Sequence, residues 1–158
     1  MKAILFGYGS IGQRHAANLK TLRPDVEIEV MDPPKKMTAY GEKFDAAIIS
    51  SPTKDHADAM YWLGPRSIPF YVEKPIGVTE LLKYSFAWPV AAVGHQYRFH
   101  REMANIRAAA ARTGVLHFHA RDDLLSRYGP DVDGVMAAHP IDTALWLLGP
   151  AHDVRLES

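Results

Sequence analysis

The sequence contains no cysteine, no long apolar run and no excess of charge of either sign. Without cysteine the chain has no disulfides, no thiol nucleophile and no thiolate metal ligands. Its 18 Lys and Arg residues balance its 18 Asp and Glu residues, so it has no general attraction for nucleic acid or an anionic membrane. The apolar run after Lys2 is too short for a signal peptide, and no stretch reaches the length of a membrane span. These absences predict a cytoplasmic protein that binds neither nucleic acid nor membrane.

Short apolar strands alternate with helical patterns over the first 94 residues. Strands are predicted at residues 2–6, 26–31, 45–50, 69–72 and 89–93. Helices are predicted from Ser10 or Ile11 to the residues before Pro24, and at residues 55–63 and 79–86. This alternation is typical of a parallel sheet covered on both faces, and it predicts an α/β fold with a doubly wound, Rossmann-type sheet.

The pattern changes after Gly94, and we place a domain boundary there. Residues 1–94 are expected to form a dinucleotide-binding domain, and residues 95–158 a separate C-terminal region. In that region we expect helices over Arg98–Arg112 and His139–Leu148, with strands at 115–121 and 153–157. The C-terminal region is therefore expected to be of the α+β type.

Gly7, Gly9 and Gly12 form a G-x-G-x-x-G pattern between the first predicted strand and the first helix. Gly7 permits the sharp turn, Gly9 lets a pyrophosphate approach the backbone, and Gly12 allows the helix to pack closely on the strand. Free N–H groups at the helix N-terminus would bind the phosphates. The alternative is a tight turn with no ligand, but the strand before and the helix after the pattern favour a dinucleotide site.

Asp32 ends the second predicted strand, 20 residues after Gly12. A carboxylate there accepts hydrogen bonds from the ribose hydroxyls of NAD. Lys35 and Lys36 follow closely and could pair with the 2′-phosphate of NADP. The sequence therefore predicts NAD as the cofactor and leaves NADP possible.

Three further groups of polar residues could carry chemistry. Glu73-Lys74-Pro75 follows the fourth predicted strand, where a lysine could donate a proton or polarise a hydroxyl. The segment from Ser51 to His56 follows the third strand, at the edge where open α/β sheets bind ligands. His139 lies one helical turn before Asp142, which suits acid–base catalysis, although a histidine that only caps the helix is the alternative.

Two histidines, His117 and His119, share one face of a predicted strand and could hold a metal ion. No third ligand is evident from the sequence, so we predict no metal site.

Five segments, in this order along the chain, resemble the Gfo/Idh/MocA family, the glucose–fructose oxidoreductase and inositol dehydrogenase group: GYGSIGQRHAANL, AAIISSPTKDHADAM, YVEKPIG, VGHQYRFH and HPIDTALWLLG. The resemblance implies that the dinucleotide is held by Gly7, Gly9, Ser10, Ile11, Gly12 and Asp32. It implies that the nicotinamide side is lined by Ser51, Pro52, His56 and Glu73. Lys74 would be the catalytic or substrate-orienting lysine, and His139 the acid–base residue. The implied reaction is hydride transfer between a nicotinamide and a sugar- or cyclitol-like alcohol.

The chain departs from the family pattern chiefly in being short. Only 13 residues, Pro33 to Asp45, separate Asp32 from Ala46, so the usual third strand of the sheet and its flanking helices do not fit there. Val135 and Met136 occupy positions where many relatives carry an acidic residue before the histidine. The family's large C-terminal sheet needs many more residues than the 158 given. We therefore expect a reduced Rossmann domain followed by a truncated C-terminal portion.

Three functions remain open at this point. The first is an NAD(P)-dependent oxidoreductase, and the second is a catalytically inactive NAD(P)-binding module or subunit. The third is a net non-redox reaction that runs through transient oxidation. Two C-terminal strands alone cannot bury a sheet face, so we also expect a homodimer joined through residues 115–121 and 152–157.

Overall fold

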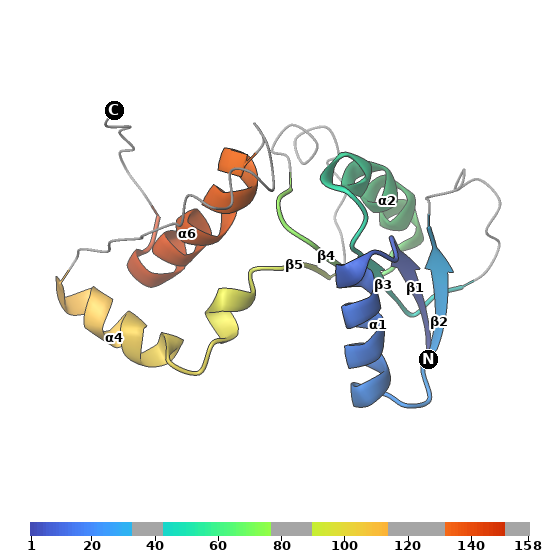
Figure 1. Ribbon diagram of the computed structural model, residues 1–158, viewed down its shortest axis with the longest axis horizontal. Coiled ribbons are helices and arrows are strands. Elements are labelled where there is room, and N and C mark those ends of the chain that lie inside the picture. The colour runs from blue at the N-terminus through green and yellow to red at the C-terminus, as the bar shows by residue number, and fades with distance from the viewer. Residues whose placement is uncertain (33–42, 77–89, 114–131, 151–158) are drawn as a thin grey trace. The chain divides into compact units, whose positions relative to one another are not determined.

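The computed structural model describes residues 1–32, 43–76, 90–113 and 132–150 (Figure 1). The chain divides into two compact units, Met1–Gly94 and His95–Ser158, and each is taken by itself below. The helix predicted at 79–86, the strands predicted at 115–121 and 153–157, and the dimer contacts expected there lie outside the described residues.

A five-stranded parallel sheet in the order β2-β1-β3-β4-β5 forms the centre of the first unit. Its strands are β1 (Lys2–Phe6), β2 (Glu27–Met31), β3 (Ala46–Ile49), β4 (Phe70–Val72) and β5 (Ala91–Val93). The five predicted strands and the α/β, Rossmann-type fold class are thus confirmed. Within the part of the chain described, β2 is an edge strand. Most of the segment in which we expect no room for the usual third strand, residues 33–42, lies outside the described residues.

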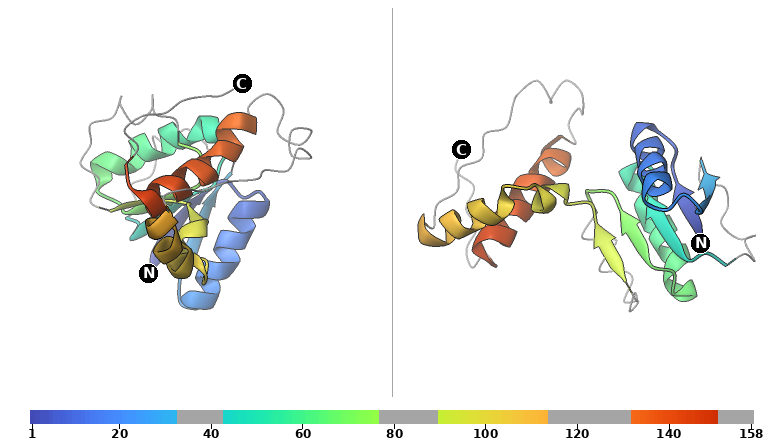
Figure 2. Two further views of the ribbon diagram at one scale, coloured as in Figure 1. Left: turned by 90° about the vertical axis from the view of Figure 1, so that its left-hand side faces the viewer. Right: turned by 90° about the horizontal axis from the view of Figure 1, so that it is seen from below.

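Helices connect the strands by crossovers in two directions. Helix α1 (Ser10–Leu22) leads from β1 to β2, and α2 (His56–Leu63), with 3₁₀ turns at Thr53–Asp55 and Gly64–Arg66, leads from β3 to β4. Because crossovers between parallel strands are right-handed, these opposite directions place α1 and α2 on opposite faces of the sheet. Figure 2 gives two further views of these elements. The reversal occurs between β1 and β3, where open α/β sheets bind their ligands.

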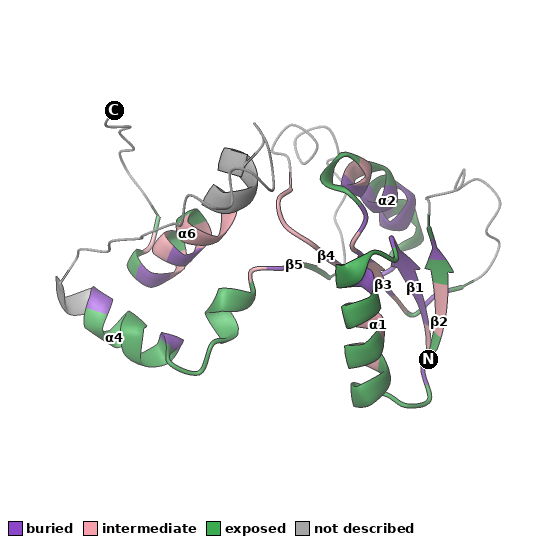
Figure 3. Ribbon diagram, viewed as in Figure 1, coloured by how far each residue is buried: buried purple, intermediate pink, exposed green. Residues whose placement is uncertain are grey.

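The main core lies between the sheet and α2. Ile4, Phe6 and Ile49 are fully buried and belong to one cluster with Leu63 of α2. The rings of Trp62 and Phe6 pack edge to face, with 6.0 Å between their centroids. Figure 3 shows this burial in β1, β3 and α2, whereas α1 is mostly exposed. The first unit is therefore stabilised mainly by the face of the sheet that α2 covers.

Two helices and a 3₁₀ turn form the described part of the second unit. They are the turn η4 (Gln96–Phe99), α4 (Met103–Thr113) and α6 (Val132–Leu148). Their contact is made by a small cluster of Met103, Ala110 and Leu147, with Trp146 packed against it.

Both helices of this unit differ from the prediction in where they begin. The helix predicted from Arg98 starts only at Met103, because His100 is extended and its Nδ1 accepts a hydrogen bond from the N–H of Glu102 (3.3 Å). The helix predicted from His139 begins at Val132 and contains Pro140. Methionine and alanines precede His139, and these strong helix formers extend the helix towards its N-terminus.

Candidate functional site

Hydrogen bonds just past the strands bring four segments level at the carboxyl edge of the sheet. Each continues the parallel ladder by one step, at 2.8–3.0 Å: Gly7 N–H to Met31 O, Ser50 N–H to Phe6 O, Glu73 N–H to Ile49 O and Gly94 N–H to Val72 O. The segments that carry the glycine pattern, Ser51 and Lys74 therefore begin at one edge of the sheet, next to the reversal between β1 and β3.

The three glycines of the opening pattern have three different environments. Gly7 has a φ of +84°, and a Cβ on it would lie 2.6 Å from the backbone of Ser51. A Cβ on Gly12 would lie 2.2 Å from the carbonyl oxygen of Gly7. A Cβ on Gly9, by contrast, would meet nothing within 4 Å. Two glycines thus let chain segments pack closely, and the third leaves open space beside the backbone.

The first turn of α1 is free to receive an anion. Gly9 is its N-cap, no side chain caps the first N–H groups, and the turn carries no acidic residue. The positive end of the helix dipole is therefore not neutralised by the helix itself. Ser10 and Ile11 of this turn, Asp32 after β2, and Pro52 after β3 are all exposed.

Serines at the end of β3 support the glycine turn. Ser50 Oγ donates to the carbonyl oxygen of Gly7 (2.9 Å) and also lies 3.2 Å from that of Phe6. Ser51 is buried against Gly7. Sequence reasoning included Ser51 but missed Ser50, because nothing in the local pattern indicates a contact to residues more than 40 positions earlier.

His56 lies buried between two loops of the site, with 3% of its surface exposed. Its Nε2 donates to the carbonyl oxygen of Ser51 (2.8 Å), and its Nδ1 lies 3.3 Å from that of Pro75. The structure therefore directs both ring nitrogens at backbone carbonyls. In this position His56 connects the loop after β3 to the turn that contains Lys74.

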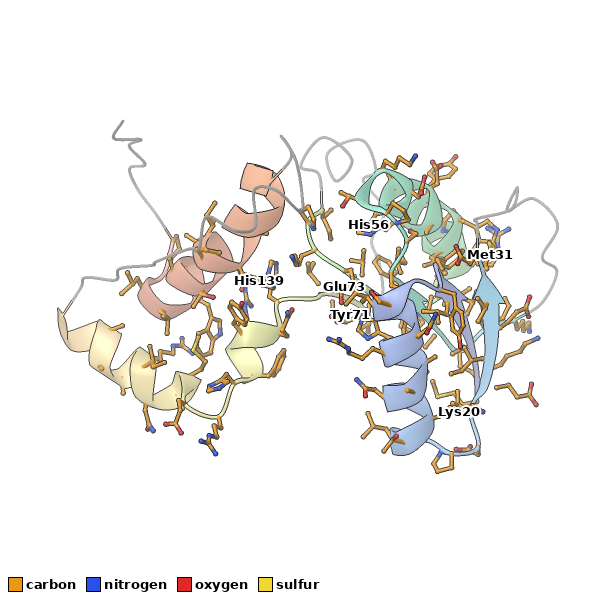
Figure 4. The ribbon with its side chains drawn as sticks, in the orientation of Figure 1. Lys20, Met31, His56, Tyr71, Glu73 and His139 are labelled. Carbon is orange, nitrogen blue, oxygen red and sulfur yellow. The ribbon has the colours of Figure 1, made fainter. Side chains whose placement is uncertain are left out.

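The carboxylate of Glu73 is bound by two side chains at the end of β4. His15 Nε2 of α1 donates to Glu73 Oε1 at 2.8 Å. The hydroxyl of Tyr71 donates to the same oxygen at 3.1 Å, and Figure 4 labels Tyr71 and Glu73. Sequence reasoning named Glu73 but gave no role to His15 or Tyr71. The only feature of the sequence that singles out His15 is that it follows Arg14 within GYGSIGQRHAANL, the first of the five segments that resemble the family.

These contacts change the ionisation of both acids in the cluster. Partial burial raises the pKa of Glu73, but the hydrogen bonds from His15 and Tyr71, the charge of His15 and the N–H of Lys74 together lower it below its ordinary value. Burial, the charge of Glu73 and the hydrogen bond to it raise the pKa of Tyr71. At neutral pH the cluster therefore contains an ionised Glu73 and a neutral Tyr71.

His139 of α6 is surrounded by aromatic rings from the start of the second unit. Tyr97 stacks on it, with 4.5 Å between ring centroids, and His95 meets it edge-on at 6.2 Å. His95 Nε2 in turn lies 3.6 Å from Asp142 Oδ1. Arg98 donates from Nε to Asp142 Oδ2 at 2.8 Å, and Nη2 of Arg98 binds the other carboxylate oxygen.

The fork between Arg98 and Asp142 ties η4 to α6. The hydrogen bond to Asp142 raises the pKa of Arg98, burial opposes this, and the charge of Asp142 adds to the rise, so the guanidinium remains charged. Sequence reasoning treated Asp142 as a partner of His139 and missed Arg98, His95 and Tyr97. The motifs VGHQYRFH and HPID contain these residues. The local sequence does not reveal that they pair, because the hydrogen bond between Arg98 and Asp142 joins residues 44 positions apart.

Clusters of metal ligands and membrane-spanning helices are both absent from the residues that the structure describes. No group of three His, Asp or Glu side chains that could hold a metal occurs among the residues described, and His117 and His119 lie outside them. No helix in the same part of the chain is long and apolar enough to cross a membrane.

Comparison with known proteins finds likeness only in solved structures, since no protein-family model and no curated protein sequence matches. A myo-inositol dehydrogenase from Corynebacterium glutamicum is 24% identical with a TM-score of 0.68, over 93% of this chain and 54% of that chain. A WlbA dehydrogenase from Thermus thermophilus, solved with NAD and alpha-ketoglutarate, is 16% identical with a TM-score of 0.71. The match covers 100% of this chain and 66% of that chain. A myo-inositol 2-dehydrogenase from Lactobacillus plantarum is 18% identical with a TM-score of 0.68. The match covers 94% of this chain and 56% of that chain.

At these identities the likeness shows the fold. The neighbours are inositol dehydrogenases and related dehydrogenases, the kind of protein that the five sequence motifs resemble. This chain spans 54% to 66% of the length of the three structures compared.

The contrast between Gly12 and Gly9 predicts two different effects on stability. Gly12→Ala forces the helix away from the Gly7 carbonyl, so we expect the free energy of unfolding to fall by about 1–3 kcal/mol. Gly9→Val meets open space, so we expect a loss below about 1 kcal/mol. Urea unfolding followed by circular dichroism measures both variants, and equal losses would show that Gly12 does not pack as described.

The lowered pKa of Glu73 predicts how stability depends on pH. Because the folded-state pKa lies below the ordinary value near 4.5, the ionised carboxylate contributes its full stability above that pH and loses it as the pH falls through the folded-state pKa. We expect the advantage of the natural protein over Glu73→Gln to shrink as the pH is lowered from 6 towards roughly 3. Urea unfolding of both proteins at several pH values measures this. An advantage that stays constant over the series would contradict the assignment.

Proposed function

We propose that this protein is an NAD-dependent oxidoreductase of the Gfo/Idh/MocA type that transfers a hydride between a nicotinamide cofactor and a sugar- or cyclitol-like alcohol. The observation that carries the proposal is the open space beside Gly9, at the uncapped N-terminus of α1 and at the reversal of the sheet. A pyrophosphate needs this combination of close backbone approach, free N–H groups and a positive helix end.

The residues at the carboxyl edge of the sheet fit a dinucleotide. In this proposal Gly7, Gly9, Ser10, Ile11 and Gly12 hold the pyrophosphate through the turn and the first helical N–H groups. The exposed Asp32 binds the ribose hydroxyls, which favours NAD over NADP. Ser51, Pro52, His56 and Glu73 form the nicotinamide side, with His56 acting from its buried position through the two loops that it connects.

The proposed chemistry assigns one role to His139 and one to Lys74. The nicotinamide, when bound, accepts or returns the hydride at the carbon that carries the hydroxyl. His139 takes the hydroxyl proton as the alcohol becomes a carbonyl, and returns it in the reverse direction. The ammonium group of Lys74 stabilises the negative charge that develops on the oxygen.

A second candidate function is a nicotinamide-binding module or subunit without turnover. It is favoured by Val135 and Met136, which occupy positions where the family resemblance implies that many relatives carry an acidic residue. In either case we propose that the protein forms a homo-oligomer.

Cofactor titration tests the binding half of the proposal. Following nicotinamide fluorescence, we expect NADH to bind and NADPH to bind more weakly. Gly9→Val, which fills the open space, is expected to weaken NADH binding by tenfold or more, a loss of about 1.4 kcal/mol. Leu22→Ala, at the exposed far end of α1, is the matched control and should bind NADH normally. Binding of neither cofactor would exclude both candidate functions, and binding of NADPH alone would exclude the role of Asp32.

Turnover tests the chemistry. With a panel of polyols and sugars, we expect reduction of NAD to be detected by the absorbance of the reduced nicotinamide. Lys74→Ala and His139→Ala are expected to lower kcat by about 10²–10⁴-fold, whereas Lys54→Ala, an exposed lysine after Pro52, should leave it unchanged. Activity that survives in both variants would contradict the assignment. Tight NADH binding without turnover on any substrate would favour the second candidate.

A further inference from the structure

His15 links α1, the helix proposed to bind the cofactor phosphates, to Glu73, the residue before Lys74. It lies three positions after Gly12 on α1, and its Nε2 donates to Glu73 Oε1 at 2.8 Å across 58 positions of sequence. Both side chains are largely shielded, with 21% and 19% of their surface exposed. Ion pairs at a fully exposed surface contribute little to stability, but a shielded, short and charge-assisted hydrogen bond also fixes geometry.

The Glu73 carboxylate is held from three sides. Tyr71 donates to the oxygen that His15 also binds, and the rings of Tyr71 and His15 meet edge to face with 5.1 Å between centroids. A Cβ on Gly94 would lie 2.4 Å from the Tyr71 hydroxyl and 3.2 Å from Glu73 Oε2. The backbone that follows β5 therefore lies directly against the cluster. Neither the tyrosine nor the carboxylate can move that way without displacing it.

The turn that contains Lys74 is fixed at both ends by histidines. On one side, His15 binds Glu73, the residue immediately before Lys74. On the other, His56 Nδ1 lies 3.3 Å from the carbonyl oxygen of Pro75, the residue immediately after it. The two histidines come from α1 and α2, which cover opposite faces of the sheet. Lys74 is thus held between contacts from both helices.

We propose that His15 is a positioning residue, which fixes the Glu73 carboxylate, and through it Lys74, relative to the helix that receives the cofactor phosphates. The proposal rests on the proposed function for its catalytic consequence, but the contact itself is independent of the cofactor. A geometric error of about 1 Å at a reacting group can lower a rate by about 10²-fold. In the proposed site Glu73 lies on the nicotinamide side, whereas the pyrophosphate is bound by the glycine turn and the first N–H groups of α1. A displaced Glu73 is therefore expected to affect turnover more than cofactor affinity.

Three variants separate positioning from plain stabilisation. His15→Ala removes the donor, and His15→Gln restores a nitrogen donor near the place of Nε2 without a ring. Asn18→Ala, on the exposed side of α1 one turn later, is the matched control. The first measurement is the rate of Lys74 acylation by acetic anhydride relative to Lys54 in the same molecule, read by mass spectrometry. It needs neither cofactor nor substrate, so it stands even if the proposed function fails.

We expect His15→Ala to change the relative acylation rate of Lys74 at least threefold, with His15→Gln and Asn18→Ala within twofold of the natural protein. The affinity for NADH should stay within about threefold in all variants. Where turnover is found, we expect His15→Ala to lower kcat about 10- to 100-fold without a matching rise in the KM for NAD, and His15→Gln to recover most of it.

Two results would overturn the proposal. One is unchanged Lys74 acylation in a folded His15→Ala protein. The other is a His15→Gln protein whose relative Lys74 acylation rate stays as far from the natural value as that of His15→Ala. That result would show that the hydrogen bond to Glu73 does not cause the effect. Tyr71→Phe serves if His15→Ala does not fold, because it removes only the second donor to Glu73. It should shift Lys74 acylation in the same direction by a smaller factor, and no shift would count against the proposal.

Discussion

The register of the parallel sheet is the constraint on which the candidate site depends. Four residues just past the strands each donate one further backbone hydrogen bond to the neighbouring strand, which sets them level with one another: Gly7, Ser50, Glu73 and Gly94. A slip of one residue in any strand would turn its side chains to the opposite face and move its loop by more than 3 Å. The buried face fixes this register, because Phe6, Ile49 and other alternate residues must all point towards α2. The packing of the core thus determines where the loops of the site begin.

Glycine makes the next step possible. The helix after β1 can start beside the end of β3 only because neither Gly7 nor Gly12 carries a side chain. The same close packing leaves α1 with a narrow contact to the sheet, and Leu22 and Ile11 remain exposed. The helical spacing of Ile11, His15, Leu19 and Leu22 correctly predicted a helix, but not a buried apolar face. Gly12, rather than a large apolar side chain, is the buried residue of α1.

Local patterns in the sequence predicted the elements, and long-range contacts decided the details of the site. Five strands, α1 and α2 follow from apolar periodicity and from turn residues, which act over a few positions. The bonds of His15 to Glu73 and of Arg98 to Asp142 join residues 58 and 44 positions apart, so no local pattern encodes them. The late start of α4 has a similar cause on a smaller scale. His100 accepts a hydrogen bond from the Glu102 N–H, and this side-chain contact competes with the helix that alanine content alone predicts.

Each residue that we propose for the chemistry is held by partners in its own unit. In the first unit, residues on either side of Lys74 are bound by His15 and His56. In the second, Tyr97 stacks on His139, and the fork from Arg98 to Asp142 fixes η4, which carries Tyr97, to α6. Neither arrangement uses the additional length that the compared dehydrogenases have. The geometry around Lys74 and that around His139 are therefore each set by contacts within one unit.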